Sequence, residues 1–596
     1  MRNPEGSIQK PAHRKLRRFL FDIFSFMNKK HSVYMRRTMG KGEMEKEMKK
    51  RILSVILTLG MTLGLLCGCG QNGGSQTEQT ETQTAKEQNY EPVVYDYEQD
   101  LNVIDDNYRN YYEIFVYSFY DSDGDGIGDF NGVIDKLDYI QDMGFNGIWL
   151  MPVLQSPTYH KYDVEDYCKV DESYGTNEDF EKLIEECHKR GIRVVMDFEM
   201  NHTSSQHEWF RQACEYLKTL SDGQQPDAAQ CPYVDYYHFS DKKENDNYYQ
   251  VAGTNWYYEG SFWSEMPDLN FANENVKKEF EDIAAFWIGK GVDGFRLDAI
   301  MHLEENKTTF NTEIMNWYYE YCKSLDPDFY MVSEVWSDEM TIADYYQSGT
   351  PSMFNFDAGN TDGALIKTAQ GGMKADTLVN RMLKYQTDFS AENPDYIDAP
   401  FLTNHDMARV SNVLQDDEDE MKFAAGLLMT MSGSPFVYYG EEIGMASSGQ
   451  KDENKRLPMI WSDTDKTGMT SGPEDADPDI TSEFPGVDEQ EKDPLSLLNY
   501  YKRAIRIRNE NPEIARGQIT KIDELCGDTQ AAITKTYQDS TIGIVYNTSD
   551  EAASIAIGDS ALKDMQIRGY LTVDGSVITL EDGTLEMPAR SICILK

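Results

Sequence analysis

The sequence predicts an α/β protein built on a (β/α)8 barrel, with an inserted domain after the third strand and a C-terminal antiparallel β-sandwich. Three observations favour this fold. From about residue 108, short apolar runs rich in β-branched residues alternate with amphipathic stretches, the pattern of repeated βα units. After residue 202, about 65 residues rich in Tyr, Trp, Asp and Gln interrupt the alternation. After about residue 517, short strands are separated by turn residues, as in a sandwich.

Eight apolar runs are expected to form the barrel strands, because eight βα units close a barrel of this type. They lie at residues 113–120, 147–153, 191–199, 294–300, 329–336, 353–357, 401–405 and 434–440. The segment 177–190 is typical of the helices between them, since its apolar residues recur every three or four positions. In such a barrel the active site lies at the C-terminal ends of the strands.

The N-terminal part of the chain is expected to be an export signal and a tether. Residues 1–68 hold 15 Lys/Arg against 5 Asp/Glu, and the apolar run at 52–66 is shorter than the about 20 residues of a membrane-spanning helix. The run ends in Leu66-Cys67-Gly68-Cys69, which resembles a bacterial lipobox with Cys69 as the lipidated residue. A cleaved signal without lipidation is the alternative. Residues 69–106 are rich in Gly, Gln, Thr and Glu, which favours a flexible tether.

Composition excludes several classes of function. The chain has 596 residues, 40% of them hydrophobic and 27% charged, so it can bury a large core. Its formal charge is −47, and the acidic excess lies beyond residue 68, so anionic polymers and membranes would repel the folded body. We therefore expect no nucleic-acid partner. We expect the protein to attach to the extracellular face of the membrane through its lipid alone, and to be a monomer. The expected domains are the barrel at 107–202 and 268–516, the inserted domain at 203–267 and the sandwich at 517–596.

Polar residues cluster at the ends of four expected strands. They are DFEMNH at 197–202, GFRLDA at 294–299, Ser333-Glu334 and Asn404-His405-Asp406. One such strand end is explained equally well by the hydrogen-bonded rim of a barrel. Four together bring carboxylates, an arginine and histidines into one mouth. Cleavage of a glycosidic bond uses such groups: a nucleophilic carboxylate, a carboxylic acid of raised pKa, and groups that stabilise positive charge at the sugar ring.

These segments resemble the conserved regions of the α-amylase family, glycoside hydrolase family 13, from about residue 111 to residue 596. The motifs occur in the family's order: GFNGIWLMPV at 144–153, YHKYD at 159–163, DFEMNH at 197–202, MPDLN at 266–270, GVDGFRLDA at 291–299, SEVW at 333–336, FLTNHD at 401–406 and YYGEEIGM at 438–445. The resemblance implies a TIM barrel and an α-glucan substrate, such as starch or maltooligosaccharides.

The resemblance also implies a role for each matched residue. Asp298 would be the nucleophile, Glu334 the general acid/base, and Asp406 the carboxylate that grips the substrate and helps distort the ring. The implied substrate contacts are Tyr162, Asp163, His202, Arg296, His302 and His405. Arg296 would hold Asp298 ionised, since a nearby cation lowers the pKa of a carboxyl group. The implied reaction retains the anomeric configuration through a covalent glycosyl-enzyme.

Bond preference is implied by three further positions. MPDLN is similar to a group between oligo-1,6-glucosidases and neopullulanases, which combines hydrolysis with transglycosylation. Ala299 after the nucleophile resembles enzymes that prefer α-1,4 bonds, whereas Val there accompanies α-1,6 specialists. Many α-amylases have Lys-His where this chain has Met301-His302, so a contact beyond the cleavage point is expected to be missing. The alternatives are an oligo-1,6-glucosidase, neopullulanase-like or trehalose synthase-like enzyme, and a non-catalytic glycan-binding lipoprotein.

An acidic loop at 121–129 (DSDGDGIGD) is expected to bind Ca²⁺. Four aspartates alternate in it, which suits the roughly 6 to 8 oxygen ligands of this ion, and without a cation they would repel one another. The expected ligands are Asp121, Asp123, Asp125, Asp129 and the carbonyl group of Ile127. Oligo-1,6-glucosidase relatives bind calcium in a loop that looks like this one. A solvated acidic turn is the alternative.

The seven cysteines beyond residue 69 are expected to be free thiols. Cys214 and Cys231 flank one stretch of the expected inserted domain, and they are the one pair considered for a disulfide.

Overall fold

The structure is a computed structural model that describes residues 104–596; the expected signal, Cys69 and most of the expected tether lie outside the described residues. Its centre is a parallel sheet whose seven strands pair in the order β11-β10-β9-β5-β2-β1-β12. They are β1 (Tyr111–Ile114), β2 (Gly147–Leu150), β5 (Arg193–Phe198), β9 (Gly294–Leu297), β10 (Tyr330–Ser333), β11 (Ser352–Met353) and β12 (Phe436–Tyr438). Two parallel bridges, Phe354–Ala399 and Phe401–Phe436, join the sheet's two edges through residues 399–401. This segment takes the seventh strand position and closes the barrel.

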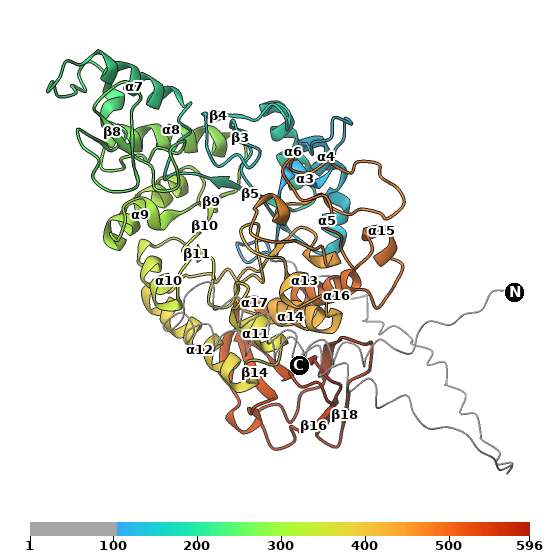
Figure 1. Ribbon diagram of the computed structural model, residues 1–596. Coiled ribbons are helices and arrows are strands. Elements are labelled where there is room, and N and C mark those ends of the chain that lie inside the picture. The colour runs from blue at the N-terminus through green and yellow to red at the C-terminus, as the bar shows by residue number, and fades with distance from the viewer. Residues whose placement is uncertain (1–103) are drawn as a thin grey trace, which may run out of the picture. The chain divides into compact units, whose positions relative to one another are not determined.

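Helices follow the strands along the chain and surround them (Figure 1). They are α4 (Phe130–Asp135), α5 (Leu137–Met143), α6 (Asn177–Lys189), α8 (Glu274–Gly289), α9 (Thr308–Leu325), α10 (Glu339–Tyr345), α11 (Ala364–Ala369), α12 (Ala375–Glu392), α13 (Val410–Val413), α14 (Glu418–Thr430), α15 (Val487–Gln490), α16 (Leu497–Glu510) and α17 (Glu513–Arg516). In α6 the expected apolar face is buried, and Thr176 and Asp179 cap the helix reciprocally. The barrel fold expected from the sequence is confirmed.

Two expected strands differ from the structure. The run 113–120 ends as a strand at Ile114, and Val116–Phe119 is the short helix α3. A short apolar run fits a buried helical turn as well as a strand, so periodicity does not separate them. The expected strand 401–405 makes one parallel bridge, at Phe401, because the chain turns into the active site directly afterwards. The strand β11 overlaps the expected run 353–357 only at Met353, and the remaining expected strands are present with shorter bounds.

Aromatic rings fill the barrel interior. Tyr111 stacks on Phe436 at 4.6 Å between ring centroids and on Tyr330 at 5.3 Å. Trp149 packs against Phe354 at 5.2 Å, and all five side chains are at most 4% exposed. Large buried rings from neighbouring strands thus pack the interior, as expected of a (β/α)8 core.

Two segments leave the barrel on the side of the site. After β2, the strands β3 (Leu154–Gln155) and β4 (Asp166–Val170) form a hairpin that carries the YHKYD motif. The expected inserted domain contains α7 (Glu208–Thr219), the turn η1 (Pro232–Asp235), and a three-stranded sheet of β6 (Phe239–Ser240), β8 (Tyr257–Glu259) and β7 (Tyr248–Gln250). The helix α7 is amphipathic and buries Phe210, Ala213 and Leu217.

The C-terminal part consists of two antiparallel sheets, as expected. The larger holds β13 (Gln518–Lys521), β14 (Gln530–Tyr537), β15 (Ser540–Asn547), β20 (Ser591–Leu595) and β17 (Ile567–Thr572). The smaller holds β16 (Ala553–Ala556), β19 (Thr584–Met587) and β18 (Thr579–Glu581). Lys535 on β14 joins the larger sheet to the barrel, donating to the carbonyl oxygens of Thr430 (2.9 Å) and Ile514 (2.7 Å).

All seven cysteines of the described residues are free, so Cys214 and Cys231 do not pair. Within residues 104–596, no helix combines the length and the apolar character needed to cross a membrane.

Candidate active site

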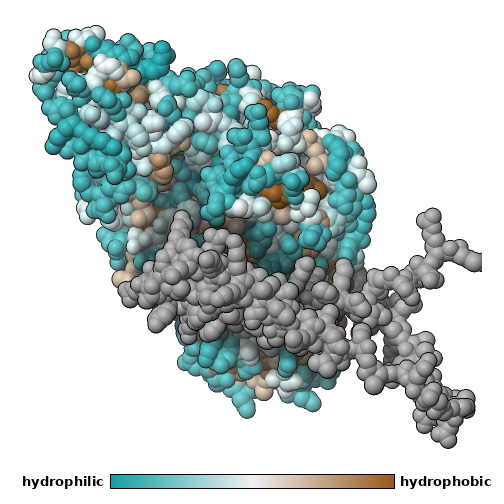
Figure 2. Space-filling view, viewed as in Figure 1, coloured by the Kyte–Doolittle hydropathy of each residue, from teal (hydrophilic) through white to brown (hydrophobic). Residues whose placement is uncertain are grey.

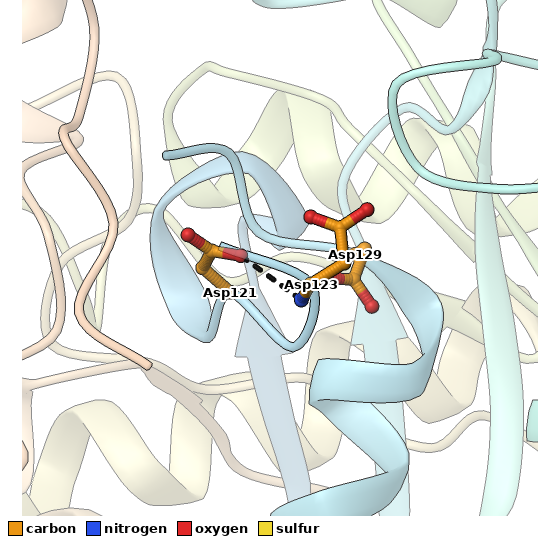
Figure 3. A group of neighbouring side chains, drawn as sticks. All are labelled: Asp121, Asp123 and Asp129. Carbon is orange, nitrogen blue, oxygen red and sulfur yellow. Dashed lines mark hydrogen bonds between the residues drawn. The ribbon is translucent and has the colours of Figure 1, made fainter. Parts of the chain in front are cut away.

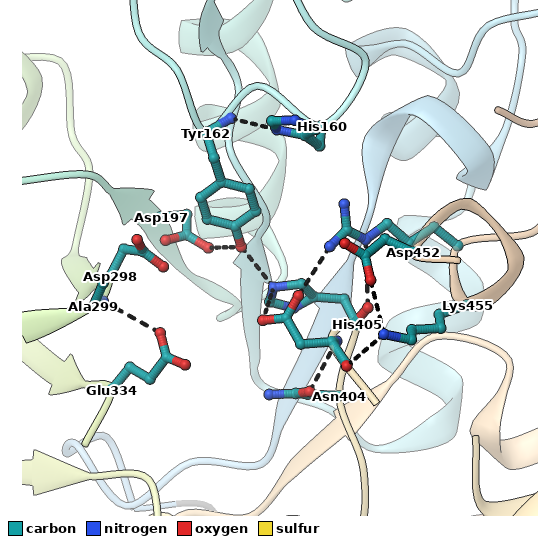
Figure 4. Close-up of polar contacts among 12 residues, drawn as sticks. His160, Tyr162, Asp197, Asp298, Ala299, Glu334, Asn404, His405, Asp452 and Lys455 are labelled. Carbon is teal, nitrogen blue, oxygen red and sulfur yellow. Dashed lines mark hydrogen bonds and ion pairs between the residues drawn. The ribbon is translucent and has the colours of Figure 1, made fainter. Parts of the chain in front are cut away.

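Three carboxylates meet around one buried arginine at the C-terminal ends of β5, β9 and β10. The Nη1 atom of Arg296 donates to Asp197 Oδ1 (2.7 Å) and to Asp298 Oδ1 (2.6 Å). Its Nη2 atom donates to Glu334 Oε2 (2.7 Å), and the Ala299 backbone N–H donates to the same oxygen (3.2 Å). One rigid guanidinium group therefore holds Asp298 and Glu334 close together, and Figure 4 shows both on the same side of Tyr162.

Tyr162 connects this cluster to a second group of charges. Its hydroxyl donates to Asp197 Oδ2 (3.1 Å) and lies 2.7 Å from Nε2 of His405. His405 is 0% exposed; its Nδ1 lies 2.5 Å from Glu113 Oε1, and its Nε2 lies 3.1 Å from Asp406 Oδ2. Figure 4 shows His405 between the tyrosine and the loop that follows β12. The two groups of charges thus share one mouth.

Asp406 is fixed from two further directions. Arg456 Nη2 donates to Asp406 Oδ1 (2.9 Å), and Lys455 Nζ donates to the Asp406 backbone carbonyl (2.7 Å). The Asp406 backbone N–H donates to Asn404 Oδ1 (3.0 Å). With these contacts, the carboxylate of Asp406 has little freedom to rotate.

Burial raises the pKa of both carboxyl groups that Arg296 joins, Glu334 and Asp298. Burial is the largest influence on Glu334 and raises its pKa to about 7, with Arg296 opposing it and Asp298 adding to it. Burial also raises the pKa of Asp298, although Arg296 lowers it. The net direction for Asp298 is therefore opposite to our expectation, because desolvation and the neighbouring Asp197 outweigh the guanidinium group.

The pair His405–Asp406 has the opposite character. Burial disfavours both charged forms, but the carboxylates of Asp406 and Glu113 raise the pKa of His405 to about 9. Burial likewise opposes ionisation of Asp406, yet His405 and then Arg456 hold its pKa well below the usual range. At neutral pH the pair is therefore an imidazolium beside a carboxylate.

The other residues expected to contact the substrate are His202, Asp163 and His302, and each has hydrogen-bond partners of its own. The His202 ring is buried, and its Nε2 lies 3.0 Å from the Tyr162 carbonyl oxygen. Asp163 accepts hydrogen bonds from Ser156 Oγ (2.8 Å) and from Thr158. His302 is partly exposed, with Nδ1 2.5 Å from Glu305 Oε1. The structure thus brings Tyr162, His405 and Arg296 to the carboxylates, and holds Asp163 and His302 through other partners.

Sequence reasoning missed three residues that shape the site. Asp197 opens the motif DFEMNH, but the motif alone does not indicate what its side chain contacts. Glu113 is a buried acid in an otherwise apolar strand, which was the one signal for it. Arg456 follows β12 in a loop without any motif, and only the fold brings it to Asp406.

The acidic loop forms a second candidate site. Oxygen atoms of Asp121, Asp123 and Asp129 lie within 4.8 Å of one another (Figure 3). Asp129 also caps α4, accepting from the Gly132 backbone N–H (2.8 Å). Asp125 lies outside this group, and its Oδ1 accepts from the Ile127 N–H (2.7 Å). Carboxylate oxygens are the hard donors that calcium takes, so these three acids form a candidate cation site.

Residues 113–517 match the family of the α-amylase catalytic domain. The chain belongs to the α-amylase family. It is 41% identical over 420 residues to Alpha-amylase 3 of Dictyoglomus thermophilum, and the match covers 70% of this chain and 80% of that protein. The solved structure of Eubacterium rectale Amy13B is 43% identical, with a TM-score of 0.82, and the match covers 85% of this chain and 99% of that one.

Members of the α-amylase family with a different name are also similar to this chain. Oligo-1,6-glucosidase of Heyndrickxia coagulans is 30% identical over 487 residues, 67% of this chain and 84% of that protein. The chain is therefore a glycoside hydrolase of the α-amylase family, whose substrates are α-glucans.

Proposed function

We propose that this enzyme is a retaining, endo-acting α-amylase that cleaves α-1,4-glucosidic bonds in starch and maltooligosaccharides. The observation that carries the proposal is the contact of one guanidinium group, that of Arg296, with both Asp298 and Glu334. Retaining enzymes hold their two carboxyl groups about 5 Å apart, whereas inverting enzymes leave a wider gap for a water molecule. Two carboxyl groups bound to one guanidinium group match the shorter spacing.

In the first step, Glu334 donates its proton to the leaving oxygen while an oxygen of Asp298 attacks the anomeric carbon. The glycosidic bond breaks and a glycosyl ester forms on Asp298. Glu334, now ionised, then takes a proton from water, which attacks the same carbon and releases Asp298. A pKa of about 7 lets Glu334 serve as acid and then as base near neutral pH.

The remaining residues position the sugar. Tyr162 stacks on the ring, and its hydroxyl keeps Asp197 and His405 in place. Asp406 hydrogen-bonds the sugar hydroxyls, and His202 lies at the same subsite. His405 positions Asp406, because its two ring nitrogens are already engaged with Glu113, Asp406 and Tyr162. Asp163 is buried and bonded to Ser156 and Thr158, so it supports the hairpin that carries Tyr162. His302 contributes from the partly exposed turn after β9. When a second sugar replaces water in the second step, the same residues carry out transglycosylation.

Trapping of the covalent intermediate tests this proposal. A 5-fluoro-α-glucosyl fluoride forms its ester quickly and releases it slowly. Mass spectrometry of a digest should then find one added glycosyl group on the peptide that carries Asp298. The Asp298→Asn enzyme should remain unlabelled, while Glu313→Asn, a change of an exposed acid on α9, should be labelled fully. A label on Glu334 or no label on the wild-type enzyme would refute the assignment.

An oligo-1,6-glucosidase activity is the second candidate, since similar relatives carry that name. Product analysis with maltoheptaose, pullulan and isomaltose separates the two. An α-amylase shortens maltoheptaose internally and leaves isomaltose intact, whereas the alternative releases glucose from isomaltose.

The acidic loop at 121–129 would hold Ca²⁺ through Asp121, Asp123 and Asp129, with Asp125 and the Ile127 carbonyl as further expected ligands. The ion would supply positive charge that offsets the mutual repulsion of these acids. It would fix the loop between α3 and α4. This loop is separate from the carboxylates around Arg296.

Lipidation of Cys69 would place the enzyme on the extracellular face of the bacterial membrane. The enzyme would act there as a monomer. Cell fractionation tests this, because Cys69→Ala should move activity from the membrane pellet to the soluble fraction. Activity that stays in the pellet after this substitution would refute the lipobox interpretation.

A further inference from the structure

A buried lysine precedes the tyrosine that connects the two groups of charges. Lys161 is 5% exposed and lies in the loop between β3 and β4, which Figure 1 labels. On the face shown in Figure 2, the surface of the described residues is largely hydrophilic, as expected where charged side chains reach water. A lysine is seldom buried without a partner, because its ammonium group loses its hydration on burial. Lys161 is therefore an exception that calls for partners inside the protein.

The backbone of Lys161 is strained. Its φ angle is 66°, in the left-handed region that residues with a side chain seldom adopt. Such a conformation persists only where the surrounding structure enforces it. The next residue along the chain is Tyr162, so the φ angle of Lys161 helps to set the direction in which the tyrosine ring projects. Relaxation of this angle would move the ring.

The side chain of Lys161 makes the contacts that enforce this conformation. Its Nζ atom lies 3.1 Å from Asp171 Oδ2 and donates to the Thr158 carbonyl oxygen (3.2 Å), so the side chain folds back onto its own turn. Nζ also lies 5.3 Å from the centre of the buried Tyr174 ring. Burial opposes the ionisation of Asp171, yet Lys161 holds the pKa of that carboxyl group below its usual range. The two residues form a buried ion pair.

Asp171 has anchors of its own. Its Oδ1 accepts from the Ser173 N–H (3.0 Å), and its Oδ2 accepts from the Ser156 N–H (3.3 Å). Its backbone N–H donates to the carbonyl oxygen of Val153, in the segment between β2 and β3 (2.9 Å). These bonds tie the carboxylate to both ends of the hairpin. Asp171 is therefore a fixed point against which Lys161 is held.

The contacts of Tyr162 depend on where this turn places it. Its N–H donates to Nδ1 of His160 (3.1 Å), and its hydroxyl reaches Asp197 and His405 (Figure 4). The Tyr162 and His405 rings are stacked, with centroids 5.7 Å apart and planes 20° apart. Hydrogen bonds weaken steeply beyond about 3.2 Å, so a displacement of about 1 Å would break those of the hydroxyl group.

We propose that Lys161 is a positioning residue for the glycosidase reaction. Its ion pair with Asp171 holds the left-handed turn that aims the Tyr162 ring at the sugar. The inference rests on the proposed function, in which Tyr162 stacks on the sugar ring. Lys161 acts through Tyr162 and not on the substrate, because its ammonium group is buried and engaged by Asp171 and Thr158. Loss of the ion pair should therefore weaken catalysis only while the tyrosine is present.

A double-mutant cycle tests this role. Lys161→Met keeps the apolar stem but removes the charge, and it should lower kcat/KM for maltoheptaose about 10- to 100-fold, because a misplacement of about 1 Å can cost that much. In the Tyr162→Ala enzyme, the same substitution should change kcat/KM by less than about twofold, since the group that it positions is gone. Rates are referred to the folded enzyme, measured by circular dichroism. A merely structural role would lower the rate by the same factor in both enzymes.

A second variant and a matched control complete the design. Asp171→Asn keeps the shape of the partner but removes its charge, so it should lower kcat/KM in the same way. Combined with Lys161→Met, it should lose no more activity than the worse single variant, because both changes break one ion pair. Lys278→Met breaks an exposed ion pair with Asp282 on α8 and should keep the wild-type rate.

Two results would overturn the inference. One is an equal loss from Lys161→Met with and without Tyr162, and the other is full activity of a folded Asp171→Asn enzyme. Where Lys161→Met does not fold, the cycle is made with Asp171→Asn and Tyr162→Ala, and the same criterion applies. A wild-type enzyme that leaves maltoheptaose uncleaved would instead overturn the proposed function.

Discussion

The raised pKa of Glu334 leads to a quantitative prediction about pH. Burial is its main cause and places the pKa at about 7. A general acid works in its protonated form, so kcat/KM for maltoheptaose should fall about tenfold per pH unit above this value. Two units above it, the loss should be about a hundredfold. The alkaline limb of kcat/KM reports the free enzyme, which is the state that the structure describes.

The Glu334→Gln variant tests the same group by a different route. Glutamine keeps the shape of the side chain but has no proton to give, so kcat/KM for maltoheptaose should fall by about 10²–10⁴. The loss should be much smaller for α-maltosyl fluoride, because fluoride leaves without a proton donor. In the Glu334→Gln enzyme, the alkaline limb near pH 7 should disappear.

The assay is a series of initial rates from pH 5 to pH 9 with both substrates. Glu313→Gln, which changes an exposed acid on α9, should keep the wild-type rate and the same limb. A wild-type profile that stays flat to pH 9 would refute the reasoning. So would equal losses on both substrates in the Glu334→Gln enzyme.

Three other predictions concern the acidic loop, bond preference and stability. EDTA should lower the melting temperature, since Ca²⁺ a hundredfold above its dissociation constant adds about 2.7 kcal/mol to folding; an unchanged scan would contradict the calcium site. Ala299→Val should lower kcat/KM for maltooligosaccharides relative to isomaltose by about 10- to 200-fold, because Ala299 adjoins Asp298, and an unchanged ratio would contradict this. Glu199→Met should raise the free energy of unfolding by about 1–3 kcal/mol, because Glu199 is 0% exposed and no other side chain of residues 104–596 bonds with its carboxyl group, and a loss of stability in urea melts would count against it.

Much of the fold could be predicted because hydrophobic periodicity marks strands and helices directly. The predicted strand at 147–153 and the predicted helix at 177–190 are present, since each has the apolar period of its element. The prediction for the run 113–120 is wrong in its second half, which is a buried helical turn.

Part of the candidate site could likewise be predicted from the sequence, and part could not. Asp298, Glu334 and Asp406 could be located because strand ends of one barrel meet in one mouth. Contacts between distant segments could not, and Glu113 reaches His405 across 292 positions. The direction of the Asp298 pKa also could not be predicted, because a motif shows the neighbouring cation but not how deeply both groups are buried.

The stereochemistry of the first product tests the central claim most directly. Proton NMR of maltoheptaose hydrolysis, recorded before the released sugar mutarotates, shows which anomer forms first. Double displacement through Asp298, with Glu334 beside it on the same guanidinium group, predicts that the α-anomer appears first and the β-anomer only later. Initial release of the β-anomer would mean a single displacement by water, and it would contradict the roles of Asp298 as nucleophile and Glu334 as general acid/base.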